Sequence, residues 1–247
     1  MSGTGEAPRP DAIDVYWAGG FNHVEGWVQA GVLPYLKHID LLQRTLGISG
    51  HVAEIGCFHG KFLIALAALL EAGGKATAID VFEDQNKNID GSGVGSRESI
   101  MRNVATYGRA DVDYGYVTAD SIAINLLAKV ELTRDRGPFR LFSVDGCHTA
   151  EHTLADLHTA QDCLAPGGVI ILDDFMQPHW PGVTQALGSF CGGSARVAPF
   201  LYAHHKLFLV GLGWRKHFFD AFMPTLGASE SAKVTTMYGG SVLSIYP

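Results

Sequence analysis

Two short stretches of the sequence contain residue types that can bind a cation and remove a proton. The stretch DGCHTAE begins with Asp145 and carries His148 three residues later, and the adjacent carboxylates Asp173 and Asp174 follow in the stretch LDDF. Carboxylate oxygens are the ligands that Mg²⁺ prefers, and histidine is the side chain whose unperturbed pKa lies closest to neutrality. This combination suits chemistry in which a metal ion orients a hydroxyl group and a base removes its proton.

Each of these residues also has an alternative interpretation. Asp145 could simply begin a turn, and His148 could be a residue at the start of a helix without a catalytic role. A zinc site is a third alternative, because His148 and His152 are four residues apart and Asp156 lies one helical turn further along. The zinc site is disfavoured, since the helix needs polar residues on its solvent side and no thiol or third histidine is well placed.

A glycine-containing loop forms a second candidate site. The stretch AEIGCFHGKF has the spacing Glu54-x-Gly56-x-x-x-Gly60, which is one glycine fewer than the dinucleotide fingerprint, so NAD is disfavoured. Gly56 permits a tight turn, and Gly60 would let the backbone approach a ligand. Glu54 suits a cationic or amine-bearing ligand, and Asp80 is well placed for ribose hydroxyls. Together these residues indicate a nucleoside ligand.

The candidate residues lie where strand patterns end, within a regular alternation of strands and helices. We expect seven strands, at residues 51–56, 76–82, 112–120, 139–146, 168–175, 195–202 and 205–212. We expect helices between them at residues 61–73, 96–108 (with Ser96 as N-cap), 121–130, 150–164 and 182–190. This order predicts an α/β fold, a Rossmann-like three-layer sandwich with a mostly parallel sheet. The short link between the last two strands predicts a reversed last strand.

Carboxylates close five successive strands of this predicted sheet. They are Glu54, Asp80, Asp120, Asp145 and the pair Asp173-Asp174. In parallel sheets, ligands bind beyond the carboxyl ends of the strands. We therefore expect these side chains to surround a single site.

The remaining parts of the chain are assigned as extensions of this core, which we place at residues 50–212. We expect residues 1–13 to be disordered and residues 14–49 to form N-terminal helices, divided at Pro34, that serve as a lid or a dimer contact. Residues 213–247 form a C-terminal extension. Its final stretch, GGSVLSIYP, is expected to be a short strand that could dock on a neighbouring subunit.

Four stretches together resemble the successive motifs of class I S-adenosylmethionine-dependent methyltransferases: VAEIGCFHGKF, AIDVF, VTADS and LAPGGVIILDDF. The resemblance implies that Glu54 and Gly56 lie near the amino acid part of the cofactor, that Asp80 holds the ribose hydroxyls, and that Asp120 and Ser121 lie by the adenine. The full set of implied cofactor-binding residues is Glu54, Gly56, Cys57, Phe58, Gly60, Asp80, Val81, Asp120 and Ser121.

The combination of DGCHTAE with the later DD narrows the resemblance. It is similar to the metal-dependent O-methyltransferases related to macrocin O-methyltransferase, which modify sugars and natural products. This implies Mg²⁺ ligation by Asp145 and by Asp173 or Asp174, with His148 as base and Asp145 also catalytic. The implied activity is methylation of a hydroxyl on a sugar or a glycosylated natural product. Ala150 stands where relatives often have an aromatic residue, which bears on the substrate. Alternatives are a cephalosporin hydroxylase-like oxidoreductase or a non-catalytic S-adenosylmethionine-binding protein.

Composition limits the other classes of function. The net charge of -7 and the lack of Lys/Arg clusters argue against nucleic acid, and no apolar run reaches the roughly 18–20 residues of a membrane helix. The four cysteines form no CxxC pair, and the chain begins without an apolar signal-peptide core. We expect a cytoplasmic protein that takes a small-molecule acceptor and forms a homo-oligomer.

Three flanking features lie near the expected site. The Gly- and Ser-rich loop of residues 83–96 could close over the ligands or be a disordered connection. His179 and Trp180 follow the fifth strand, where a ring could stack on the acceptor or pack against the sheet. Lys206, in the link between the last two strands, could also face the site.

Overall fold

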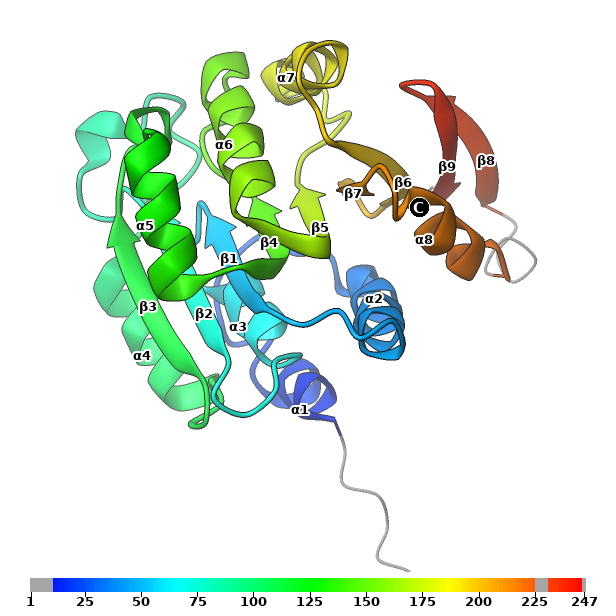
Figure 1. Ribbon diagram of the computed structural model, residues 1–247. Helices are drawn as coiled ribbons and strands as arrows, with labels where there is room; N and C mark the ends of the chain where they lie inside the picture. Colours follow the sequence, from blue (N-terminus) through cyan, green and yellow to red (C-terminus); the bar gives the residue numbers. More distant parts are fainter. Residues whose placement is uncertain (1–10, 225–230, 246–247) are drawn as a thin grey trace, which may run out of the picture.

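The predicted strands form one continuous sheet in the computed structural model, which describes residues 11–224 and 231–245 (Figure 1). The strands are β1 His51–Ile55, β2 Lys75–Asp80, β3 Asp113–Thr118, β4 Phe139–Val144, β5 Leu164–Leu172, β6 Val197–Ala203, β7 Lys206–Gly211, β8 Ala232–Met237 and β9 Gly240–Ile245. Their order across the sheet is β3-β2-β1-β4-β5-β7-β6-β9-β8.

Helices cover both faces of the sheet and complete three layers (Figure 1). They are α1 Ala12–Gly19, α2 Leu33–Thr45, α3 Lys61–Ala67, α4 Arg97–Tyr107, α5 Leu126–Arg136, α6 Ala150–Cys163, α7 Pro181–Gly192 and α8 Arg215–Phe222, with short 3-10 turns at Ala30–Val32, Gln85–Lys87 and Ser121–Ala123. The apolar side chains of α1 to α4 and α8 pack in one cluster, and those of α6 and α7 in another. The predicted three-layer α/β sandwich is confirmed.

The direction of the strands also follows the prediction. Strands β1 to β5 pair in parallel, whereas β7 runs antiparallel to both β5 and β6. His204 and His205 make the turn between β6 and β7, both with positive φ (52° and 63°). The short link therefore acts as a hairpin, and the reversed strand lies inside the sheet.

The number of strands differs from the prediction, because nine strands form within the described residues and seven were expected. The two additional strands come from the segment assigned as a C-terminal extension. Strand β9 pairs in parallel with β6 of the same chain, with Leu243 opposite Leu201. The expected docking on a neighbouring subunit is therefore replaced by an intrachain contact that buries Val242, Leu243 and Ile245.

The N-terminal region also differs in detail. Residues 1–10 of the segment expected to be disordered lie outside the described residues, and the helix α1 already begins at Ala12. Pro34 occupies the first turn of α2 and does not divide two helices. A proline is tolerated there because the amide it lacks would have no partner within the helix.

Strand β1 lies at the centre of the parallel part of the sheet, and its residues 52–55 are buried. The loop after β1 leads to α3 on one face, and the loop after its neighbour β4 leads to α6 on the other face (Figure 1). Such a switch in strand order opens a crevice at the carboxyl ends of the strands. Within the described residues, no helix is both long enough and apolar enough to cross a membrane.

Candidate active site

A pocket of about 520 Å³ opens at the carboxyl ends of β1, β2, β4 and β5. Most of the residues singled out from the sequence line it: Glu54, Gly56, Cys57, Phe58, Asp80, Val81, Asp120, Ser121, Asp145, His148, Asp173 and Asp174. The structure thus brings together the nucleoside-type residues and the carboxylate–histidine residues in a single cavity, as the strand-end positions predicted.

The glycine loop after β1 packs directly on the loop after β4. Gly56 has a φ of +79°, and a Cβ built on it would lie 1.8 Å from the carbonyl oxygen of Asp145. Only glycine fits at this position, because the φ is positive and because a Cβ would clash with the Asp145 carbonyl oxygen. The Asp80 carboxylate accepts a hydrogen bond from the Cys57 amide (2.7 Å), so the end of β2 also fixes this loop.

Gly60, one of the expected cofactor contacts, is not among the residues that line the pocket. Its φ of +83° turns the chain into α3, and its Cα faces the side chain of Ile100. Its left-handed conformation is by itself a reason for a glycine at this position.

Glu54 is a buried carboxyl group at the floor of the pocket, with 1 % of its surface exposed. Its Oε2 atom has no hydrogen-bond partner. Burial raises the pKa of Glu54 to about 8, although the nearby Lys206 ammonium acts in the opposite direction. An unpartnered buried acceptor of this kind is suited to a ligand that brings its own donor or positive charge.

A different wall of the pocket carries Asp120, Ser121 and His152. The Asp120 carboxylate caps the short turn that follows β3 by accepting from the Ile122 amide, and it lies 3.7 Å from His152 Nε2. The other ring nitrogen of His152 is hydrogen-bonded to the Thr149 hydroxyl. These groups present polar atoms to the end of the pocket next to β3.

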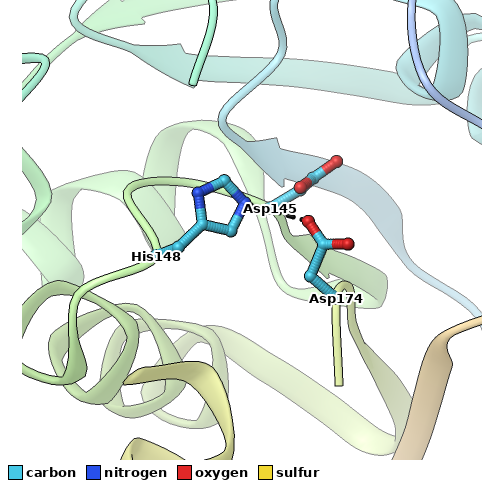
Figure 2. A group of neighbouring side chains, drawn as sticks. All are labelled: Asp145, His148 and Asp174. Carbon is cyan, nitrogen blue, oxygen red and sulfur yellow. Dashed lines mark hydrogen bonds and ion pairs between the residues drawn. The ribbon is translucent and has the colours of Figure 1, made fainter. Parts of the chain in front are cut away.

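Asp145, His148 and Asp174 converge at the opposite wall, as Figure 2 shows. Asp145 and His148 come from the loop between β4 and α6, and Asp174 from the turn after β5. One ligand atom from each of the three residues lies within 4.8 Å of the others. Burial and the Asp173 carboxylate raise the pKa of Asp145 well above its usual value, with Lys206 opposing them.

His148 is held at both ring nitrogens. Nδ1 and the backbone amide of His148 each lie 2.7 Å from Asp90 Oδ2, and Nε2 lies 3.0 Å from Asp174 Oδ2. The Trp180 ring stacks on the imidazole at 4.1 Å. Burial lowers the pKa of His148, but the hydrogen bonds to Asp174 and Asp90 outweigh it and leave the pKa raised.

The same contact shifts the pKa of Asp90 in the opposite direction. Burial alone would raise its pKa, but the hydrogen bonds from His148 lower it to about 2. The sequence did not single out this residue, because it lies in the loop after β2, 58 positions from His148, in the stretch IDGSG, which is typical of a turn. The loop of residues 83–96 lies against the site, where Asp90 contacts His148.

Asp173 faces a different partner from Asp174. Its Oδ2 accepts a hydrogen bond from the buried ammonium of Lys206, and its Oδ1 accepts from the Asp174 amide at 2.8 Å. Burial lowers the pKa of Lys206, but Asp173 and Asp145 raise it more. Of the two adjacent carboxylates, only Asp174 joins the three-residue group with Asp145 and His148.

The alternative zinc face does not form among the described residues. His152 is bonded to Thr149, and Asp156 is fully buried with neither carboxylate oxygen hydrogen-bonded. Burial raises the pKa of Asp156 to about 7. The group that could hold a metal contains neither of these residues.

A segment before α2 also lines the pocket, and the sequence had suggested it only in general terms as a lid. Trp27, which is 71 % exposed, packs on Phe58 with ring centroids 4.8 Å apart. Lys61 at the start of α3 donates to the Gly26 carbonyl (3.3 Å) and lies over the Phe21 ring. The N-terminal region therefore supplies part of one wall.

Comparison with solved structures gives the same architecture at low sequence identity. The O-methyltransferase NovP matches with a TM-score of 0.56 and 15 % identity, covering 72 % of this chain and 78 % of that one. CalS11, a TDP-rhamnose 3'-O-methyltransferase of calicheamicin biosynthesis, matches with 0.50 and 17 %, covering 84 % and 89 %. MycE from the mycinamycin pathway, in complex with Mg, SAH and mycinamycin VI, matches with 0.52 and 14 %, covering 83 % and 55 %.

The sequence itself gives a family assignment. No curated protein matches it significantly. Residues 53–175, which span β1 to the turn after β5 and include Asp145, His148 and Asp174, match the family described as a methyltransferase domain. On this match, residues 53–175 form a methyltransferase domain, and the solved structures share its fold.

Proposed function

We propose that the protein is an S-adenosylmethionine-dependent O-methyltransferase that acts on a hydroxyl of a small molecule with the help of a divalent cation. The observation that carries the proposal is the placement of His148, Asp145 and Asp174 in the same pocket as the loop after β1. A methyl donor bound on that loop and a hydroxyl bound at His148 would meet within a single cavity.

The cofactor is assigned to the walls next to β1, β2 and β3. Glu54 offers an unpartnered buried acceptor to the amino acid end. Asp80 uses its oxygens to fix the loop amides yet still lines the pocket, so it can accept from ribose hydroxyls. Asp120 and Ser121 would then lie by the adenine. These assignments rest on the fold and on the positions of the residues at the strand ends.

The donor set at the other wall fits a hard divalent cation such as Mg²⁺. Asp145 and Asp174 supply carboxylate oxygens within reach of a common point, and the wall opens to the pocket, so water and substrate oxygens can complete the shell. A bound cation would lower the pKa of an acceptor hydroxyl and fix its position.

His148 is the proposed general base. Asp90 accepts the Nδ1 proton, so the neutral imidazole carries its lone pair on Nε2, which faces the pocket wall formed by Asp174. An acceptor hydroxyl that takes the place of Asp174 Oδ2 at Nε2 would transfer its proton there. Its oxygen forms the new bond to the methyl carbon while the carbon–sulfur bond breaks, with the electron pair staying on sulfur. Much of the acceleration should come from holding the two reactants in line.

A sugar or a glycosylated natural product is the proposed acceptor. CalS11, which shares the fold, acts on TDP-rhamnose, and MycE was solved with a mycinamycin. The pocket is flanked by the exposed ring of Trp27 and by Trp180, and indole faces pack well on the apolar faces of sugars. Paired sugar hydroxyls would also suit a site with two carboxylates.

The first test is thermal melting with S-adenosylhomocysteine, NAD⁺ or 2-oxoglutarate, each with and without Mg²⁺. A ligand at about 100 times its dissociation constant adds roughly 2.7 kcal/mol, which for a chain of this size raises the melting temperature by roughly 5–10 °C. We expect a shift with S-adenosylhomocysteine alone. A shift with NAD⁺ or 2-oxoglutarate instead would favour the oxidoreductase alternative.

Removal of the base tests the catalytic assignment. We expect His148→Gln to lower the rate of methyl transfer by about 10²–10⁴-fold and to leave S-adenosylhomocysteine binding nearly unchanged, because the ring lies on the acceptor side of the pocket. His158→Gln, which changes a histidine on α6 that packs on Phe190, is the matched control. Full activity of His148→Gln on a confirmed acceptor would contradict the proposal.

A further inference from the structure

A lysine side chain lies buried beneath the carboxylates of the site. Lys206, at the start of β7, has 2 % of its surface exposed, and its ammonium donates to Asp173 Oδ2. The same ammonium lies 4.4 Å from the centre of the Phe62 ring. A buried ammonium with one carboxylate partner and one aromatic face is a fixed internal charge.

This ion pair determines the direction in which Asp173 points. One Asp173 oxygen is taken by Lys206, and the other accepts from the Asp174 amide at 2.8 Å. Asp174 has a φ of +53°, a conformation that non-glycine residues adopt only with support. Asp173 therefore holds the backbone of Asp174 in the turn that presents Asp174 to His148.

We propose that Lys206 and Asp173 form an internal ion pair that removes Asp173 from the cation site, so that Asp145 and Asp174 are its only carboxylate ligands. The proposal depends on the proposed function only in taking the site to bind a divalent cation. In this arrangement Asp173 is a positioning residue, and Lys206 limits how strongly the site attracts cations.

The charges support this division of roles. When Asp145, Asp173 and Asp174 are all ionised, as a bound cation would favour, they carry three negative charges, and the Lys206 ammonium reduces the sum to two, which one divalent cation balances. Charges separated by a few ångströms in a partly buried site interact strongly. Removal of the ammonium would free Asp173 and raise the affinity for a cation.

The experiment is a titration with Mn²⁺ followed by electron paramagnetic resonance, at pH 8 and without methyl donor or acceptor. We expect Lys206→Met to bind Mn²⁺ about tenfold more tightly than the wild type, or more. Lys61→Met is the matched control, because Lys61 also lines the pocket and lies over a phenylalanine ring, but it contacts no carboxylate of this group. The control should bind Mn²⁺ as the wild type does.

A double variant guards against misfolding of the single one. Lys206→Met with Asp173→Asn replaces the ion pair by neutral side chains of similar size, which buried pairs often tolerate. We expect it to keep Mn²⁺ affinity within about threefold of the wild type, whereas Asp174→Asn loses most of the binding. Loss of binding in the double variant to the level of Asp174→Asn would show that Asp173 is a ligand and overturn the proposal.

The remaining outcomes are equally decisive. Binding by Lys206→Met but not by the wild type would support the proposal in a stronger form. Unchanged affinity in Lys206→Met, or no binding in either protein, would contradict it. Because no methyl transfer is measured, a failure here is distinct from a failure to bind S-adenosylhomocysteine, which would count against the proposed function.

Discussion

His148 lies between two carboxylates, and this arrangement makes its protonation state the most sensitive property of the site. The hydrogen bonds to Asp174 and Asp90 raise the pKa of His148 above its usual 6.5 despite burial. If His148 is the base, as we propose, it must be neutral to accept a proton, so activity should be low in acid and should rise with pH through this raised pKa.

Asp90→Asn tests this link at the scale of one residue. The amide removes a negative charge from Nδ1, so the pKa of His148 should fall and the acid limb of the profile of kcat against pH should move to lower pH. The maximal rate should also fall, because the imidazole is less firmly oriented. Asp84→Asn, in the same loop but paired with Lys87, should leave the profile in place. An acid limb that does not move would contradict the proposed role of Asp90.

Glu54→Gln tests the buried carboxyl group through stability. The pKa of Glu54 is about 8 in the folded chain, against 4.5 for the exposed group. Between these values the folded protein keeps a proton that the unfolded chain releases, so stability falls as pH rises, at a cost of about 3 kcal/mol at pH 7. At pH 8 the cost is about 4 kcal/mol, so the glutamine variant should melt roughly 9–17 °C above the wild type there, and much closer to it at pH 5.

A matched substitution separates this effect from a general change of charge. Glu131→Gln, on the exposed side of α5, should have the same melting temperature as the wild type at both pH values. If Glu54→Gln shows the same gain at pH 5 as at pH 8, the carboxyl group does not titrate as its burial implies.

At the scale of elements, the loops after β1 and β4 are joined by a contact that allows no side chain. Gly56→Ala would place a methyl group 1.8 Å from the Asp145 carbonyl oxygen, so it should destabilise the fold by several kcal/mol and disturb the base. Gly73 has nearly the same φ (+76°) but has nothing within 4 Å, so Gly73→Ala should cost only about 1–2 kcal/mol. Equal losses on thermal melting would show that backbone strain alone, and not the contact, requires Gly56.

The elements that position the site could be predicted from the sequence because each leaves a local signal. The alternation of strand and helix patterns predicted the strands. The carboxylates at the ends of those strands indicated one edge of the sheet. Ser96 was predicted as an N-cap, and its side chain accepts from the Ser99 amide. These features depend on residues that are close in sequence, which is why they were visible.

The features that were missed depend on contacts between distant parts of the chain. Asp90 reaches His148 from a loop without periodicity, and nothing local distinguishes it from a turn residue. The pairing of Lys206 with Asp173 follows from the antiparallel register that places Leu207 opposite Leu172, which the sequence does not specify. Strand β9 was recognised as a strand, but its partner β6 is distant in sequence, because β7, α8 and β8 lie between them along the chain.

At the scale of the whole molecule, the last two strands belong to the folded core. A chain that ends at residue 230 would lose β9 and leave the edge of β6 unpaired, with the apolar surface that Val242 and Leu243 cover. We expect this variant to aggregate or to melt far below the full chain, because an exposed apolar edge strand recruits other chains. Removal of residues 246 and 247 alone is the control. Normal melting and solubility of the shorter chain would mean that the core ends near residue 212, as the sequence suggested.

The close contact between Gly56 and Asp145 also has a consequence for turnover. Two loops that touch backbone to backbone cannot separate to admit or release a ligand, so this floor of the pocket stays fixed. We expect the segment of residues 25–28 and the loop after β2 to move instead; they meet where Gly93 lies against Phe58 and Trp27. Asp90 belongs to that same loop, so an opening of the loop would also withdraw the hydrogen-bond partner of the proposed base His148. The enzyme would then be competent for chemistry only while it is closed.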